Sequence, residues 1–310
     1  MTRVLKLEGR ELTDGLLFPE GPVVMPDGSV VVVEIKGQRL IRVAPDGGKD
    51  VMADLGGGPN GAALGPDGWI YVCNNGGFNW ITRDDGYMRP HGRWDRYETG
   101  SIQRVDPTSG AVEVLFDACE GEPLKGPNDI VFDGRGGFYF TDHGKSWDRM
   151  MDRGAVFYAA EDGSFIREVA FPLVTANGVG LSPDGGTLYV TETETGRLWS
   201  YPVIEPGVLG KQPWPSPCGG SFVGGSLGFQ RFDSMAVEEG GNICVASLVR
   251  GGVCVFTPAG ELLEFWEAPE PYCTNIAFGG QYRRKAYITL SGHGRLIEVE
   301  WPRSGLQLAF

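Results

Sequence analysis

Six side chains that carry an oxygen acceptor recur along this chain, each at the head of a similar stretch of small and apolar residues. The second apolar run begins 11 residues after the polar residue in four copies and 12 residues after it in two. Hard divalent cations such as Ca²⁺, Mg²⁺ and Mn²⁺ prefer carboxylate and amide oxygens, and the set lacks the His and Cys that zinc favours. The six residues are Glu20, Asn60, Asn128, Asn177, Asp233 and Asn275.

A simpler interpretation of these residues is turn chemistry. Asn before Gly is common because Asn tolerates turn conformations, so one such dipeptide carries little information. The replacement of Asn by Glu20 and Asp233 in two equivalent places is harder to explain in that way. Two carboxylates brought together would repel, and each would be costly to desolvate without a counterion. Their two charges match one divalent cation, so the pattern predicts a cation site.

Each repeat has the pattern of an antiparallel hairpin, which is the element that must position these side chains. In the second copy, 60–64 is one strand, 66–68 the turn and 69–73 the next strand, and a D-G turn between apolar runs is a strong hairpin signal. A further short strand follows each hairpin, so we expect about four strands per unit. These following segments are 37–45, 101–107, 154–163, 196–204, 251–262 and 294–301.

The repeat predicts the architecture. The units recur every 40 to 68 residues, and no segment shows a helical apolar period over a useful length. Four antiparallel strands per unit, repeated radially, make a β-propeller blade. We therefore predict an all-β, six-bladed β-propeller, formed as a single domain over 1–310, with sequence from both ends sharing a blade to close the ring. Equivalent positions are then related by rotation, so the six polar residues should form one ring near one mouth of the channel.

Two long segments, about 74–100 and 205–232, interrupt the repeats and are expected to be loops. Loops of this length in a compact domain are usually either functional or mobile. The first is rich in Gly, Arg and aromatic residues, and we expect Phe78, Trp80 and Trp94 either to form an apolar wall over the cation or to pin the loop to the propeller.

The composition limits the partners and the location. A net charge of −13 argues against nucleic acid and anionic membranes, which require a basic patch. The N-terminus lacks the apolar segment of a signal peptide, and no apolar run is long enough for a membrane span. We expect a cytoplasmic protein that acts on a small molecule; the oligomeric state stays open. The cysteines show no zinc-like spacing and are expected to be reduced: Cys73, Cys119, Cys218, Cys244, Cys254 and Cys273.

Four motifs, in order and at blade spacing, carry a resemblance to a known family. They are FPEGP (18–22), GPNDIVFD (126–133), ANGVGLSPDGGTLYVTET (176–193) and FDSMAVEEGGNICVAS (232–247). With them the chain resembles, over nearly its whole length, the gluconolactonase, senescence marker protein and luciferin-regenerating enzyme family. That family consists of six-bladed propellers with one catalytic divalent cation.

The resemblance implies a role for each matching residue. It makes Glu20 a carboxylate ligand, Asn128 a ligand or a substrate contact, Asn177 a ligand, and Asp233 both a ligand and the candidate catalytic base. In the last motif Ser234 replaces the family's Gly, so the local turn at Asp233 departs from the family's pattern. The more distant diisopropylfluorophosphatase shares this metal arrangement, so the ligands alone do not fix the substrate.

The resulting hypothesis is a metal-dependent hydrolase that opens a small lactone. The cation, Ca²⁺ first and Mg²⁺, Mn²⁺ or Zn²⁺ as alternatives, would polarise the carbonyl group while water attacks and Asp233 takes a proton. Two alternatives stay open: a metal-dependent non-hydrolytic enzyme such as an isomerase, and a non-catalytic calcium- or ligand-binding propeller. Asn60 and Asn275 are expected to face the substrate or to be structural.

The three histidines and one serine-hydrolase motif are further candidates for chemistry. His143 follows a strand directly and is expected to contact substrate or move a proton, the alternative being a rim histidine that binds solvent. His91 and His293 are expected at the surface. Gly224–Gly228 matches the G-x-S-x-G motif of serine hydrolases, but no helix follows in the sequence, so we expect no nucleophile there.

Overall fold

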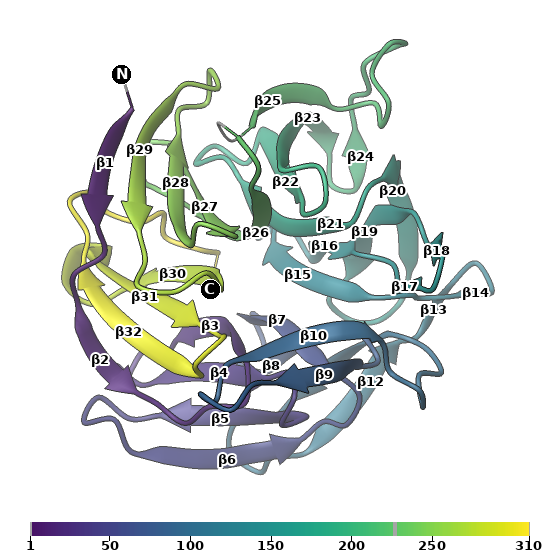
Figure 1. Cartoon of the computed structure of the whole chain (residues 1–310). Helices are drawn as coiled ribbons and strands as arrows, with labels where there is room; N and C mark the ends of the chain where they lie inside the picture. Colours follow the sequence, from purple (N-terminus) through teal and green to yellow (C-terminus); the bar gives the residue numbers. More distant parts are fainter. Residues whose placement is uncertain (1, 226–227, 310) are drawn as a thin grey trace.

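The computed structural model describes residues 2–225 and 228–309 and is an all-β, six-bladed propeller, as the repeat predicts (Figure 1). Each blade is a sheet whose first strand lies at the central channel. These inner strands pack against one another in sequence order, and the last packs against the first. They are β3 (Pro19–Val24), β7 (Pro59–Leu64), β15 (Pro127–Phe132), β21 (Ala176–Leu181), β26 (Arg231–Val237) and β30 (Cys273–Gly279).

Three more strands follow outward in each blade, all paired antiparallel. The second strands are β4 (Val30–Glu34), β8 (Ile70–Asn74), β16 (Gly137–Asp142), β22 (Thr187–Glu192), β27 (Ile243–Leu248) and β31 (Lys285–Leu290). The third strands are β5 (Arg39–Val43), β11 (Ser101–Val105), β19 (Gly154–Ala160), β23 (Arg197–Glu205), β28 (Gly252–Phe256) and β32 (Arg295–Glu300). The outer strands are β6 (Lys49–Asp54), β12 (Val112–Phe116), β20 (Ile166–Leu173), β25 (Ser221–Gly225), β29 (Leu262–Glu267) and β2 (Arg10–Thr13).

The second strands are apolar along almost their whole length because each blade is covered on both faces by its neighbours. In β4, all four residues of Val30–Val33 are fully buried. A strand buried on both faces has a continuous apolar sequence in place of an alternating one. The hydrophobic core therefore consists of layers between blades around the channel.

The ring closes in the predicted way, with one addition. The N-terminal strand β2 pairs antiparallel with β32 as the outer strand of the sixth blade. The preceding strand β1 (Arg3–Lys6) pairs parallel with β29 and adds a fifth strand to the fifth blade, which the sequence did not predict. Strands from both ends of the chain thus join the last two blades.

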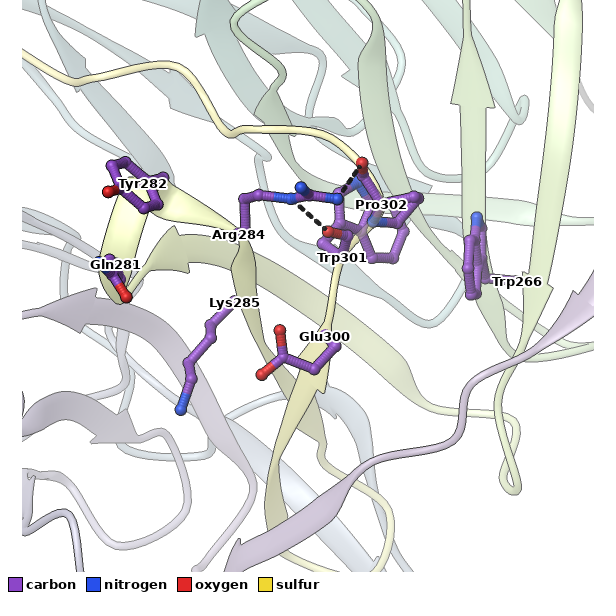
Figure 2. A pocket seen from close by; sticks show the side chains of 8 residues that line it. All are labelled: Trp266, Gln281, Tyr282, Arg284, Lys285, Glu300, Trp301 and Pro302. Atoms are coloured by element: carbon purple, nitrogen blue, oxygen red, sulfur yellow. Dashed lines mark hydrogen bonds between the residues drawn. The ribbon is translucent and has the colours of Figure 1, made fainter.

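The segment after β32 fixes the same two blades together. Glu238, fully buried, accepts hydrogen bonds from Trp301 Nε1 at 2.8 Å and from Arg303 Nε at 2.6 Å. Arg303 also donates to Glu264 on β29. Beside this junction, Arg284 donates to the carbonyl oxygens of Trp301 and Pro302 at the edge of a surface hollow of about 450 Å³ (Figure 2).

The two long segments are more regular than predicted, so their description as loops was wrong in part. Segment 74–100 contains the hairpin β9 (Phe78–Thr82) and β10 (Met88–Arg93), which closes at the D-G turn of Asp85 and Gly86. The hairpin was not predicted because Pro90 and Gly92 interrupt the sequence pattern of its second strand, β10. Segment 205–232 contains β24 (Val208–Leu209) and the outer strand β25.

Five further short elements lie outside the main strands of the blades. The elements are β13 (Ala118–Cys119), β14 (Glu122–Pro123), β17 (Ser146–Trp147), β18 (Met150–Met151) and the short helix η1 (Gln281–Arg283). All six cysteines fall in the described ranges, and each is a buried free thiol. Of the G-x-S-x-G match, Ser226 and Leu227 lie outside the described residues. Within those residues, no helix has the length and apolar character that crossing a bilayer requires.

Candidate functional site

All six polar residues of the repeat lie at the same end of the channel. Each is the second or third residue of its inner strand, and the six inner strands enter the channel side by side. At each of these positions the pairing with the second strand shifts register, which marks a β-bulge. A bulge lets a strand turn a side chain away from the ordinary alternation, and bulges are common beside functional sites. We call these six residues the polar ring.

The Gly that follows several ring residues is needed for close approach of neighbouring strands. A Cβ on Gly21 would lie 2.5 Å from the carbonyl oxygen of Asn60, and one on Gly178 would lie 2.8 Å from that of Asp233. Real Cβ atoms do not come this close to a carbonyl oxygen. The E-G and N-G dipeptides are therefore part of inner strands in which the backbones nearly touch, and they are not turns.

Glu20 is a buried carboxylate held by two donors. Its side chain is 2% exposed, and its Oε2 accepts hydrogen bonds from Gly21 N at 2.8 Å and Asn275 Nδ2 at 2.7 Å. Burial raises the pKa of Glu20 to about 7, although these hydrogen bonds act in the opposite direction. Asn275, expected to face substrate or to be structural, is thus a hydrogen-bond partner of Glu20, and its Oδ1 accepts from Ile276 N.

Asn177 and Asp233 lie together on neighbouring blades. Asn177 donates to Thr193 Oγ1 at 2.9 Å and accepts a long hydrogen bond from Ser234 Oγ at 3.5 Å. Burial raises the pKa of Asp233 well above its usual range, and the charges of Glu20 and Asp129 add to this effect, while a hydrogen bond with Asn177 opposes it. Ser234, which replaces the family's Gly, is fully buried and contacts Asn177 without displacing Asp233 from the ring.

Asn128 has an unsatisfied acceptor. It is 6% exposed, and within the described part of the chain its Oδ1 has no hydrogen-bond donor. A buried acceptor without a partner costs about 1–3 kcal/mol, so a ligand that supplies positive charge there is favoured. Asn60, also 6% exposed, lies on β7 between Glu20 and Asn128 in the order of the ring.

Asp129 is a third carboxylate that the sequence reasoning missed. It lines the central cavity and accepts hydrogen bonds from Ile130 N at 3.1 Å and Val179 N at 3.2 Å. Burial, together with the smaller effect of the charge of Glu20, raises the pKa of Asp129 to about 8. Asp129 could have been found from the sequence because it follows Asn128 directly in the P-N-D motif. Both residues lie within the bulge of β15.

The donor set fits a hard cation. Three carboxylates whose ionisation is opposed by burial, together with an unpartnered amide oxygen, form a site that a divalent cation would stabilise. Among the residues that the structure describes, no three His, Cys, Asp or Glu side chains are grouped as a metal site. The set therefore depends on mixed carboxylate and amide oxygens, as the sequence predicts, and suits Ca²⁺ or Mg²⁺ better than zinc.

Hydroxyl groups from the second strands hold the backbone of the ring. Thr141 on β16 donates to the carbonyl oxygen of Asn177 in the next blade. Thr191 on β22 does the same for Asp233, at 2.8 Å. The third and fourth blades thereby each fix the backbone of the ring residue in the blade that follows.

Acidic and amide side chains at the ends of second strands fix the segments that lead into the ring. They accept hydrogen bonds from backbone N–H groups that precede the inner strands by a few residues. Asp142 accepts from Lys125 N at 2.8 Å and from Gly126 N at 2.7 Å. The equivalent acceptors are Glu34, Asn74 and Glu192.

The ring separates two spaces. On one side, a cavity of about 650 Å³ runs along the channel past mainly apolar side chains such as Val23, Val179 and Met235. Residues 306–309 also line this cavity. On the other side lies the mouth formed by the segments that precede the inner strands, which we call the upper mouth.

His143 lies in the upper mouth at the end of β16. Its backbone N–H donates to the Gly126 carbonyl oxygen at 2.8 Å, and the residue is partly exposed. Burial, with smaller effects of the positive charges of Lys145 and Arg231, lowers the pKa of His143 to about 4. The imidazole is therefore neutral near pH 7 and can donate or accept a hydrogen bond, but it is not a resident cation. His91 and His293 are exposed, as expected.

The β9–β10 insertion is fixed beside this mouth by a buried lysine. Lys145 is 2% exposed and donates to Asn75 Oδ1 at 3.1 Å and to the Gly77 carbonyl oxygen at 3.0 Å. Its Nζ lies 4.1 Å from the centre of the Phe78 ring, a cation–π contact. Trp80 packs against Phe18 at 5.0 Å. Phe78 and Trp80 thus pin the insertion in place, one of the two roles expected for them; Trp94 is partly exposed.

Comparisons with known proteins agree with this architecture. Lactonase drp35 of Staphylococcus saprophyticus is 31% identical over 209 residues, covering 66% of this chain and 56% of that protein. The gluconolactonase of Zymomonas mobilis is 25% identical over 292 residues, covering 86% of this chain and 75% of that one.

A solved structure described as the calcium-binding protein regucalcin, from Agrobacterium tumefaciens, has the same fold. Its TM-score is 0.75 at 19% identity, with 99% of this chain and 100% of that chain covered. The model of the SMP-30/Gluconolactonase/LRE-like region matches residues 18–292, which include all six ring residues. The chain belongs to the SMP-30/gluconolactonase/LRE-like family.

Proposed function

We propose that this protein hydrolyses small lactones with the help of one divalent cation bound in the polar ring. The observation that carries the proposal is the buried, unpartnered Oδ1 of Asn128 in a ring that also holds the carboxylates of Glu20 and Asp233, with the carboxylate of Asp129 on the adjoining residue. Buried carboxylates without a countercharge are costly, and a cation removes that cost. The names of the lactonase and gluconolactonase relatives support the reaction class.

Glu20, Asn128, Asn177 and Asp233 are the residues we assign to the cation. Ca²⁺ is the first choice because all four offer oxygen donors and a structural neighbour is described as calcium-binding. When bound, such a cation would act as a Lewis acid that polarises the lactone carbonyl group.

The chain supplies the other parts of the reaction. Water adds to the carbonyl carbon, and we assign Asp233 to accept the proton that the water loses. The ring C–O bond then breaks and its oxygen is protonated, so one water is consumed and a hydroxy acid is formed. We assign Asn177 to orient the Asp233 side chain through a hydrogen bond. The Thr191 hydroxyl donates to the backbone carbonyl oxygen of Asp233 and holds its main chain. We assign Asn60 and His143 to contact the substrate, and Asn275 to orient Glu20 as well as border the substrate.

The decisive experiment is a lactone panel assayed by proton release in Ca²⁺ and in chelator. We expect hydrolysis that chelator abolishes and added metal restores. Asp233→Asn should lower kcat by a factor of at least 100 with an unchanged circular dichroism spectrum, because it removes the base and one ligand charge. Near-normal turnover of that variant contradicts the assignment. Metal binding without turnover indicates a binding propeller, and turnover without net proton release indicates an isomerase.

A further inference from the structure

Arg231 occupies the position directly above the ring on the fifth blade. It precedes Asp233 by two residues and lies just before the bulge of β26; Phe232 next to it is fully buried in the core between blades, so the Arg231 side chain lies on the opposite face of the strand from that core. The residues two positions before the other ring members are Phe18, Gly58, Gly126, Thr175 and Cys273. None of these five is charged, so the fifth blade is distinct at this level.

The structure places Arg231 at the start of β26, where it pairs with Leu248 on β27 and its guanidinium reaches Glu194 of the preceding blade. The charge of Arg231 also opposes the burial-driven rise of the pKa of the Tyr272 phenol and lowers the pKa of His143. Arg231 therefore sets a positive charge two residues before Asp233 in a protein of net charge −13.

The donors of Arg231 are only partly used. Its Nη2 pairs with Glu194 Oε2 at 2.9 Å, but both side chains are 40% exposed, so water screens and weakens this ion pair. Its Nε is buried and, in residues 2–225 and 228–309, has no hydrogen-bond partner. A guanidinium group presents several donors in one plane and binds carboxylate or phosphate oxygens in pairs.

We propose that Arg231 binds an anionic group carried by the substrate, so the preferred lactones bear a carboxylate, phosphate or similar anion remote from the ester. This inference rests on the function proposed above and narrows its substrate class. Residues two apart on a strand are roughly 7 Å apart, so a substrate whose carbonyl lies at the ring can reach Arg231 with a substituent on the far side of a six-membered lactone.

The kinetic test compares two lactones that differ in one charged group. The probes are glucono-1,5-lactone and its 6-phosphate, with wild-type protein and Arg231→Gln in Ca²⁺-containing buffer. We expect wild type to favour the phosphate ester in kcat/KM, and Arg231→Gln to lose at least tenfold for that ester, mainly through KM. The neutral lactone should change less than threefold. Equal losses for both lactones, no loss for either, or a wild-type preference for the neutral lactone would overturn the proposal.

A binding measurement separates this proposal from the proposed hydrolysis. Calorimetry with gluconate, glucarate and 6-phosphogluconate needs no turnover, and the last two distinguish carboxylate from phosphate recognition. Wild type should bind at least one dianion tenfold more tightly than gluconate, and Arg231→Gln should remove that preference. If neither lactone is hydrolysed but the preference for the dianion is found, the proposed lactone hydrolysis is refuted and the proposed anion site at Arg231 is supported. Hydrolysis without any charge preference refutes the anion site alone.

Two variants serve as controls. Arg250→Gln removes a similar half-exposed Arg–Glu pair on the same blade, because Arg250 pairs with Glu267 at 3.1 Å, and should leave the preference for the anion unchanged. Glu194→Gln removes the carboxylate that competes for Arg231 and should preserve or strengthen binding of the dianion. A loss of preference in either variant contradicts a specific role of Arg231.

Discussion

Replacing Glu20 by Gln tests whether the ring is built for a cation. In the metal-free protein the pKa of Glu20 is about 7 against an ordinary value of 4.5. This difference corresponds to roughly 3 kcal/mol. Because the folded-state pKa lies above the unfolded one, the penalty is absent below pH 4.5, grows as the pH rises, and is complete above pH 7. Glu20→Gln should therefore stabilise the metal-free protein by about 3 kcal/mol at pH 8 and have little effect near pH 4.5.

The assay is urea unfolding in chelator at several pH values between 4.5 and 8. The amide oxygen of Gln can still accept from Gly21 N and Asn275 Nδ2, so the change removes mainly the charge. Added Ca²⁺ should stabilise the wild type and stabilise Glu20→Gln much less, since binding to the folded state adds stability in proportion to affinity. Glu113→Gln, on the outer strand β12, is the control for net charge. Destabilisation by Glu20→Gln at every pH would refute the reasoning.

Two further predictions concern the supports of the site. Arg303→Ala leaves the fully buried Glu238 without its guanidinium and should cost about 3–5 kcal/mol in urea unfolding; a loss below 1 kcal/mol would show that the junction of the last two blades does not need this pair. Lys145→Met removes the donors to Asn75 and Gly77, so proteolysis within β9–β10 should accelerate at least tenfold while the unfolding midpoint changes little; unchanged cleavage would contradict the anchoring role.

The fold could be predicted because the blade pattern is local in sequence. Each hairpin contains both apolar runs and its turn within a few residues, and burial on both faces makes runs such as 30–33 visible. The parallel pairing of β1 with β29 could not be predicted in this way. Its partners, such as Arg3 and Glu264, lie far apart in sequence, and a short strand that is largely exposed carries no apolar signature of its neighbour.

The site was predictable where the repeat itself encodes it. The six ring residues are equivalent by rotation, so alignment of the repeats was enough to bring them together. Asp129, Lys145 and Arg231 fall outside that equivalence. Their significance depends on burial and on partners in other blades, such as the contact of Lys145 with Asn75. No single-sequence pattern distinguishes a buried lysine in a turn from an exposed one.

The polar ring also links the proposed chemistry to the stability of the propeller. Its members come from six blades, and contacts such as that of Thr191 with the backbone of Asp233 join neighbouring blades there. In the metal-free protein, burial and mutual repulsion oppose the ionisation of Glu20, Asp129 and Asp233 at the one point where all blades meet. A cation bound there neutralises these charges and favours the closed ring. Under the function proposed above, the carboxylates that would serve the reaction would therefore also make the stability of the propeller rise with the concentration of the cation, because a ligand that binds only the folded state stabilises that state.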